Sequence, residues 1–225
     1  MNTDRSCPSP TLPLLLPLGD RALLVRFGST LSEQANRAAI GFAERAKALG
    51  GAEEVVPNLV SVMIRFDLRR TTYETLAGEV RLLLGTGAEL QDASLRRQEI
   101  AVHFGGEAGP DLGEVANSLA LSQAEFIQQH NATELRVLAT GFAPGFVYCG
   151  FHPESLHVAR RSAVHARVPA GSVLFAAGQT AITSTPIPTG WHVIGRTDFI
   201  NFNPGSGPPT QLKPGDRVRF RSEPR

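Results

Sequence analysis

The pattern of apolar and polar positions in the first half of the chain alternates between strand and helix periods. Ala22–Phe27 is a short apolar run typical of a strand. In Leu59–Phe66 apolar side chains occupy every second position, which is the period of a half-buried strand. A third strand is expected near Glu53–Val56, and the turn Pro57-Asn58 separates it from Leu59–Phe66.

Two segments of this half have apolar residues at helical spacing. The first follows a capping-box pattern at Thr30 and Glu33, and Gly50-Gly51 ends it. The second follows the same pattern at Thr71 and Glu74. The order is therefore strand, helix, strand, strand, helix, and a closing strand would give an α+β domain with the ferredoxin-like split βαβ arrangement.

The second half of the chain has a different pattern. A strand at Glu99–Phe104 is followed by two short helices, at Asp111–Ala120 and after a capping box of Ser122 with Glu125. Residues 1–100 hold eight Gly and five Pro, whereas residues 101–225 hold fourteen and eleven. Many short strands interrupted by Gly and Pro favour a small, mainly β, closed barrel over a parallel sheet.

We therefore expect two domains, a small α+β domain at residues 1–92 and a β-barrel domain at 93–225, with the boundary in the charged stretch Gln91–Gln98. Thr11–Leu18 is apolar, but it is interrupted by prolines and far too short to span a bilayer. We interpret it as a frayed end that leads into the first strand, and not as a signal peptide. No membrane association is expected.

Composition excludes some classes of function. A hydrophobic fraction of 42% and a charged fraction of 19% are those of an ordinary soluble protein. A net charge of +1 argues against a nucleic-acid-binding surface. Cys7 and Cys149 fit no metal-ligand spacing, so we expect free thiols in a reducing cytoplasm.

The segment Gly141–Gly150 is the most unusual stretch of the sequence. Its glycines permit a close approach to the backbone, and its aromatic side chains offer stacking surfaces. It therefore predicts either a wall of a binding site or a plug at one end of the barrel. The candidate substrate-binding residues in it are Phe142, Pro144, Gly145, Phe146 and Tyr148.

Arginines and polar turns follow this segment. Arg160, Arg161, Arg167 and Arg196 carry guanidinium groups that match carboxylate or phosphate oxygens, although single surface arginines are usually solvated. Two turns offer hydroxyl and amide groups that suit a small polar substrate or an oxyanion, but spacing alone favours hairpin turns. The residues of these turns are Gly171, Ser172, Gln179 and Thr180.

Other sites with a known sequence signature are not found. The six histidines form no metal-binding pattern, and no phosphate loop, dinucleotide fingerprint or nucleophile elbow occurs. We expect no bound metal or prosthetic group. His103, beside Gly105-Gly106, is the histidine chosen for a catalytic test, whereas Trp191 is expected to be a core anchor.

An ordered set of motifs resembles one family over nearly the whole chain after residue 17. They are Leu18-Gly19-Asp20-Arg21-Ala22, His103-Phe104-Gly105-Gly106, Gly109-Pro110-Asp111-Leu112, Gly141–Gly150, Arg160-Arg161, Arg167–Val173, Gly178-Gln179-Thr180, Gly190-Trp191, Ile194–Thr197 and Leu212–Asp216. The chain resembles the B-type subunit of the bacterial ATP-dependent 5-oxoprolinases, a family also known as Kip-type kinase inhibitors or allophanate hydrolase subunit 1.

The resemblance implies a small α+β domain and a cyclophilin-like barrel. It also implies a complex with two partners, a homologous barrel protein (the C-type 5-oxoprolinase chain, or allophanate hydrolase subunit 2 type) and a lactam-utilisation protein (the A-type chain). That complex, with ATP and Mg, converts 5-oxo-L-proline, ATP and water to L-glutamate, ADP and phosphate. This chain alone would be inactive. Arg161 and Arg167, with His103, are the candidate catalytic residues, because developing charge needs cationic groups and N–H donors.

Two other functions are ascribed to this family or its relatives. One is inhibition of a sensor histidine kinase, which would then be a partner, and the other is an amide or urea carboxyltransferase or allophanate hydrolase-type activity. The sequence departs from the family pattern near the presumed site, for example at Val147 in place of Pro and Cys149 in place of Leu. These departures bear on which substrate the site accepts more than on the fold.

Overall fold

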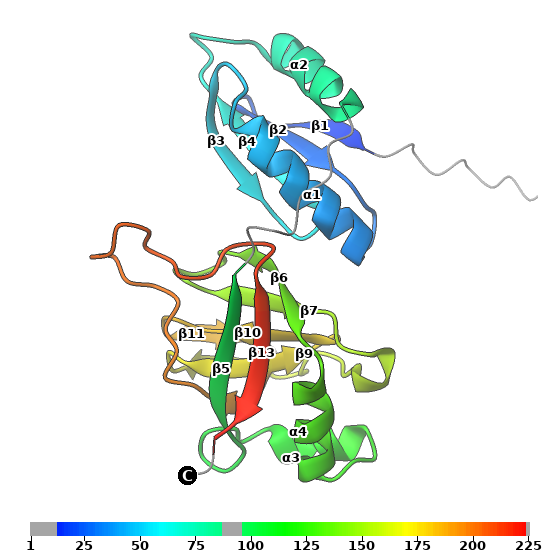
Figure 1. Ribbon diagram of the computed structural model, residues 1–225, viewed down its shortest axis with the longest axis vertical. Helices are drawn as coiled ribbons and strands as arrows, with labels where there is room; N and C mark the ends of the chain where they lie inside the picture. The colour runs from blue at the N-terminus through cyan, green and yellow to red at the C-terminus, as the bar shows by residue number, and fades with distance from the viewer. Residues whose placement is uncertain (1–12, 87–95, 224–225) are drawn as a thin grey trace, which may run out of the picture. The chain divides into compact units, whose positions relative to one another are not determined.

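A computed structural model describes residues 13–86 and 96–223 (Figure 1). The chain divides into two compact units, one within residues 1–91 and the other within residues 92–225. The predicted domain boundary after residue 92 lies outside the described residues.

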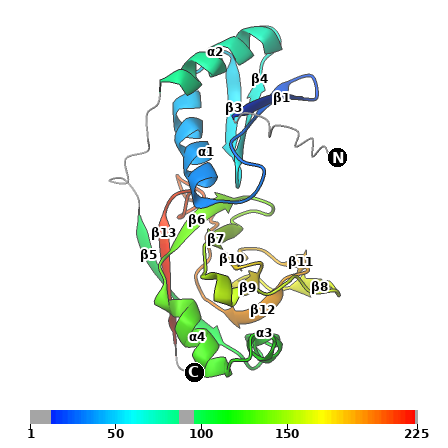
Figure 2. The same cartoon turned by 90° about the vertical axis from the view of Figure 1, so that its right-hand side faces the viewer.

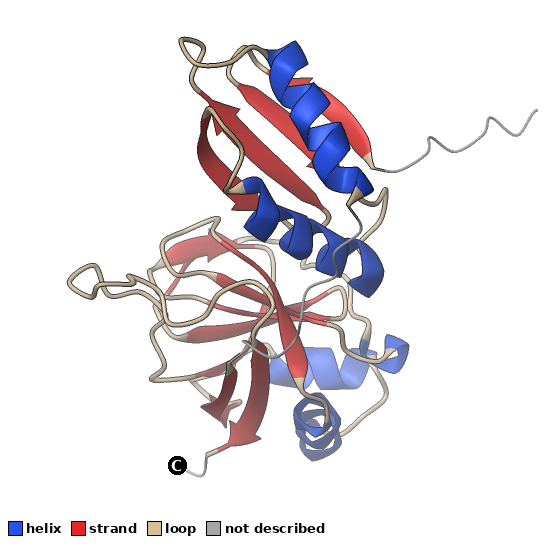
Figure 3. Cartoon of the chain, turned by 45° about the horizontal axis from the view of Figure 1, so that its top comes forward, coloured by secondary structure: helices blue, strands red, loops and turns tan. Residues whose placement is uncertain are grey.

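Unit one is a four-stranded antiparallel sheet with two helices on one face (Figure 3). Apolar side chains from both helices and from alternate positions of the two central strands form a single buried cluster. In spatial order the strands are β1 (Leu14–Leu18), β2 (Ala22–Arg26), β4 (Ser61–Phe66) and β3 (Ala52–Pro57), and the helices are α1 (Glu33–Ala46) and α2 (Tyr73–Gly85).

The structure corrects the sequence prediction at three places in this unit. Leu14–Leu18 is not a frayed end, because it pairs with β2 along its whole length. The edge position beside β2 is therefore taken by a strand that precedes it, and the ferredoxin-like arrangement with a closing strand after the second helix is not confirmed. The caps also differ: Ser32 and Thr72, not Thr30 and Thr71, accept hydrogen bonds from the first turns of α1 and α2.

Unit two is built on a closed barrel, as predicted, and the barrel has seven strands (Figure 2). In order around the barrel these are β10 (Gln179–Ile182), β7 (Val147–Gly150), β6 (Leu135–Thr140), β13 (Arg217–Ser222), β5 (Arg97–Phe104), β12 (His192–Arg196) and β9 (Ser172–Ala176). Outside it lie a small sheet of β8 (His165–Val168) with β11 (Ile187–Thr189), and the helices α3 (Leu112–Ser118), α4 (Gln123–Ala132) and η2 (Glu154–Leu156).

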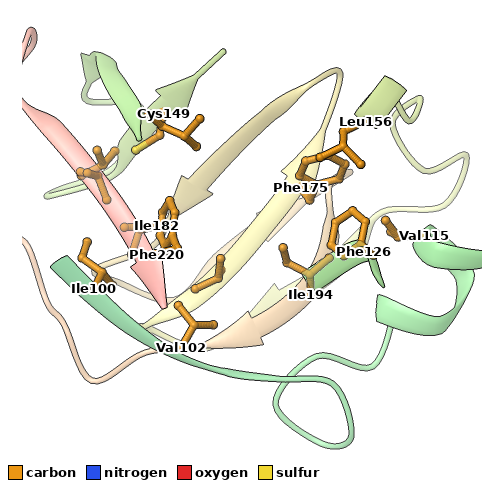
Figure 4. Packing of buried hydrophobic residues seen from close by; sticks show 14 of the residues in the cluster. Ile100, Val102, Val115, Phe126, Cys149, Leu156, Phe175, Ile182, Ile194 and Phe220 are labelled. Atoms are coloured by element: carbon orange, nitrogen blue, oxygen red, sulfur yellow. The ribbon is translucent and has the colours of Figure 1, made fainter. Parts of the chain in front are cut away.

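Strand alternation separates two apolar layers in this unit. Val173 and Phe175 of β9 point into the barrel, where they join a large cluster that also includes Phe126 of α4 (Figure 4). Leu174 and Ala176 point outward and join a second cluster, which the strands β8 and β11 also contribute to. Trp191 belongs to that outer cluster and is only 7% exposed, so its expected role as a core anchor is confirmed.

Candidate functional site

The loop at the start of Gly141–Gly150 is held in one conformation by its neighbours. Gly145 has φ +70°, and a Cβ there would lie 2.5 Å from the Cβ of Phe202. The Ser184 hydroxyl donates to the Gly145 carbonyl at 3.0 Å and accepts from the Asn201 N–H at 2.9 Å. Phe142 has φ +73°, which is rare for a residue with a side chain, and it is 73% exposed. The loop therefore presents an aromatic ring to solvent from a braced backbone.

Four aromatic rings form a row on the outer side of the barrel. Phe142 and Phe146 have ring centroids 5.5 Å apart, Phe146 and Tyr148 4.7 Å, and Tyr148 and Trp191 6.0 Å. The guanidinium of Arg160 lies 5.7 Å from the centre of the Trp191 ring. Partial burial raises the pKa of Tyr148, and the charge of Arg160 opposes that shift. These rings are absent from the apolar cluster inside the barrel, so they do not plug it. Phe146 and Trp191 are buried in the outer cluster, and the row reaches solvent at Phe142 and at the half-buried Tyr148.

The buried carboxylate of Asp111 is bonded to the segment that follows Trp191, at one end of this row. Asp111 precedes α3, and its side chain is 9% exposed. Its Oδ1 accepts from Arg161 Nη1 at 2.7 Å, and its Oδ2 accepts from the Val193 N–H at 2.7 Å and from His165 Nε2 at 2.8 Å. Arg161 also contacts Glu114 at 3.3 Å. Arg161, a candidate catalytic residue, is thus engaged in holding Asp111.

The predicted polar turns are largely closed by the chain itself. The Ser172 hydroxyl donates to the Pro169 carbonyl at 2.8 Å, and its N–H donates to Thr183 Oγ1 at 3.0 Å. Gly171 has φ +79°, and a Cβ there would lie 2.3 Å from the Thr197 carbonyl oxygen. Ala177 and Gly178, both with positive φ, form the two-residue hairpin loop between β9 and β10. These contacts are those of turns at strand ends and in a hairpin, and not those of a surface that faces a ligand.

Thr180 lies inside the barrel between two buried histidines. Its Oγ1 is 2.8 Å from His130 Nε2 and 2.8 Å from His152 Nε2. His130 Nδ1 is 2.8 Å from Asn131 Oδ1, so Nδ1 carries the proton and Nε2 accepts from Thr180. His152 then donates to Thr180 through Nε2. Burial lowers the pKa of His130 to about 4, and burial together with the charge of His130 lowers that of His152 to about 2.

The remaining candidates lie apart from these groups. His103 is hydrogen-bonded through Nδ1 to the Glu223 carbonyl at 3.2 Å, at the end of β13. Arg167 is exposed on β8, and Pro144 is exposed in the braced loop. Gln179 is half-buried and directly follows the hairpin loop. Its side chain points out of the barrel, because the next residue of the strand, Thr180, points into it. The structure thus joins Phe142, Phe146 and Tyr148 in one row and does not bring His103 or Arg167 to it.

Sequence reasoning missed His165 and gave no role to Asp111. Neither stands in a recognisable catalytic motif, and 54 positions separate them. The fold of unit two brings the start of α3 to β8, a strand outside the barrel. The motif Gly109-Pro110-Asp111-Leu112, which the chain shares with the family it resembles, was the one sequence feature that pointed to Asp111.

No metal-ligand group of three or more His, Cys, Asp or Glu side chains occurs within residues 13–86 and 96–223. Cys149 is buried with a free thiol, and burial raises its pKa to about 12. Among the helices that the structure describes, none is long and apolar enough to cross a membrane.

Comparison with known proteins agrees with these features. The family model of the carboxyltransferase domain, subdomain C and D, matches residues 13–212. The B-type 5-oxoprolinase subunit of Bacillus subtilis is 36% identical over 216 residues, which cover 90% of this chain and 90% of that protein. The B-type 5-oxoprolinase subunit of Haemophilus influenzae is 33% identical over 208 residues, covering 92% of this chain and 96% of that protein.

A solved structure, that of the protein TTHA0988, superposes with a TM-score of 0.80 at 35% identity. The match covers 91% of this chain but 40% of that chain, so this chain spans about two fifths of that protein's length. The residues matched by the family model, 13–212, take in the aromatic row and Asp111 with its partners. The chain belongs to the carboxyltransferase-domain family of subdomains C and D, and within it to the B-type subunits of 5-oxoprolinase.

Proposed function

We propose that this chain is a subunit of an ATP-dependent 5-oxoprolinase. The observation that carries the proposal is the similarity to the B-type 5-oxoprolinase subunit of Bacillus subtilis, which extends over 90% of both chains. The reaction consumes 5-oxo-L-proline, ATP and two waters, and yields L-glutamate, ADP and phosphate. One water opens the lactam, and the other releases the phosphate.

The active form in this proposal is a complex. This chain works with the homologous barrel protein and the lactam-utilisation protein, and it is inactive alone. ATP and Mg act at the level of that complex, since the sequence has no phosphate loop of its own. The relatives are themselves designated as subunits, which supports an assembly of several chains.

The aromatic row is the part of this chain that suits the substrate. Phe142 and Tyr148 present ring surface to a small lactam ring, and Arg160 supplies a cation for its carboxylate. A lactam is a poor electrophile, so ATP is used to phosphorylate its oxygen and create a leaving group. Arg167 remains a candidate for binding the negative charge of the phosphate, because it is exposed.

The test is reconstitution from the three purified proteins, with glutamate and ADP measured in the same reaction. We expect both products in equal amounts, and neither when this chain is omitted. Phe142→Ala should raise the KM for 5-oxoproline, whereas Leu82→Ala, which also removes an exposed apolar side chain but lies on α2, should not. A complete complex that leaves 5-oxoproline intact would refute the proposed function.

A further inference from the structure

His165 is oriented by a buried carboxylate in the manner of an Asp–His pair. Its Nε2 lies 2.8 Å from Asp111 Oδ2. Arg161 on Oδ1 and the Val193 N–H on Oδ2 prevent the carboxylate from turning away. Because a carboxylate offers only acceptor sites, the proton of this bond must lie on His165 Nε2.

The other ring nitrogen of His165 is available. In neutral imidazole, protonation at Nε2 leaves a lone pair at Nδ1. Nδ1 has no hydrogen-bond partner within the described part of the chain, and the His165 side chain is 27% exposed, against 9% for Asp111. A buried orienting acid and a partly exposed imidazole form the arrangement that general bases use.

His165 also lies beside the segment that carries one end of the aromatic row. In the small sheet, His165 of β8 pairs with Thr189 of β11, two residues before Trp191. The N–H of Arg161 donates to the Gly190 carbonyl at 2.8 Å, which fastens the same segment from its other side. His165 is therefore held next to the segment that leads into Trp191, the ring over which Arg160 lies.

We propose that His165 is a catalytic residue of this chain, the general base that activates water toward an ATP-activated lactam, and that Asp111 is its positioning residue. The proposal rests on the proposed function and names a base that the sequence did not indicate. Water is the nucleophile, and the electrophile is the C5 atom of the O-phosphorylated lactam.

In this step His165 Nδ1 takes a proton from water as the water oxygen forms a bond to C5. The electrons of the C5=N double bond move to the ring nitrogen, which takes the proton from Nδ1. The hydroxyl of the adduct then passes its proton through Nδ1 to the same nitrogen, as the ring C5–N bond breaks and the C5=O bond of the acyl phosphate forms. The product of this step is γ-glutamyl phosphate with a free amine, which a second water hydrolyses to glutamate and phosphate. His165 ends in its starting protonation state, and no oxidant or reductant is needed.

A purely structural role for the same bond is the competing explanation, since it also ties the start of α3 to β8. The charged and titratable groups around His165 are Asp111 directly, and Arg161 and Glu114 through it. A test must therefore separate lost base catalysis from lost stability. Chemical rescue does so, because added imidazole replaces a missing base and does not repair a loosened fold.

The experiment compares reconstituted complexes that contain wild-type chain, His165→Ala, Asp111→Asn or the exposed-histidine control His157→Ala. We expect His165→Ala to lower kcat about 100-fold or more with KM changed less than about threefold, and imidazole to restore activity only to that variant. Asp111→Asn should lower kcat at least about tenfold, because its amide cannot hold the same tautomer. His157→Ala should match the wild type.

Stability and assembly are measured on the same samples by thermal unfolding and co-purification. An unchanged kcat in His165→Ala, or a reduced kcat that imidazole does not raise in a variant that folds and assembles, overturns the inference and leaves the proposed function intact. If His165→Ala fails to fold, Asp111→Asn decides, and a wild-type kcat in that variant overturns the inference. A wild-type complex without activity refutes the proposed function itself.

Discussion

The two histidines inside the barrel predict a steep loss of stability in mild acid. His130 and His152 share the Thr180 hydroxyl, and their rings lie 4.7 Å apart, centre to centre. Both are held neutral in the folded barrel, with pKa values of about 4 and about 2 that are set chiefly by burial. In the unfolded chain each ring has the ordinary histidine pKa of about 6.5.

The direction in which stability changes with pH follows from the number of protons that the folded and unfolded chains bind. Below about pH 6.5 the unfolded chain binds up to two more protons than the folded chain, so stability is full above that pH and falls as the pH is lowered. Each ring contributes a loss of about 2 kcal/mol between pH 7.5 and pH 5, or about 4 kcal/mol for the pair. Because a protein domain is stable by about 5–15 kcal/mol, this is a large share of the total.

Urea unfolding followed by fluorescence measures this loss, because Trp191 is the single tryptophan of the chain and lies in unit two. His130→Gln and His152→Gln should each reduce the slope of unfolding free energy against pH by about half. His157→Gln, which removes an exposed ring, should leave that slope unchanged. A wild-type loss below about 1 kcal/mol at pH 5 would refute the reasoning, as would equal slopes in all variants.

Three further predictions concern single positions. Gly145→Ala should cost at least about 2 kcal/mol in urea unfolding, because φ is +70° and its Cβ meets a side-chain carbon at 2.5 Å, whereas Gly207→Ala, with open space around it, should be nearly neutral. Arg160→Gln should raise the KM for 5-oxoproline about tenfold in the reconstituted complex, and the exposed Arg219→Gln should not. Ser122→Ala should cost about 1 kcal/mol, because it removes a complete capping box; an unchanged midpoint would contradict this.

Short-range pattern predicted much of the fold. The half-buried period of Leu59–Phe66, the Ser122 cap and the closed barrel are all present in the structure. The strand Leu14–Leu18 was missed because consecutive leucines and a proline show no alternation, and only its partner strand makes it regular.

The candidate site was harder to predict, because residue type does not reveal which side of a strand a group faces. Thr180 and Ser172 were chosen for their hydroxyls, yet both hydroxyls are bonded within the barrel unit. The grouping of Phe142, Phe146 and Tyr148 was predictable because all three stand in one short aromatic segment, although strand alternation applies only from Val147 onward. The pairing of Asp111 with His165 depends on contacts between distant segments, which no local pattern encodes.

Asp111 departs from the way this chain caps its other helices. Ser32, Thr72 and Ser122 have extended backbone and accept from their helices, but Asp111 has ψ −2° and makes no capping bond. Its carboxylate serves three distant donors instead, so Asp111→Ala should leave the buried Val193 N–H without an acceptor. We expect a loss of about 3 kcal/mol in urea unfolding, roughly three times that of Ser122→Ala. Equal losses would mean that the bonds of the Asp111 carboxylate to its distant donors contribute no more to stability than one helix cap, which would contradict this reasoning.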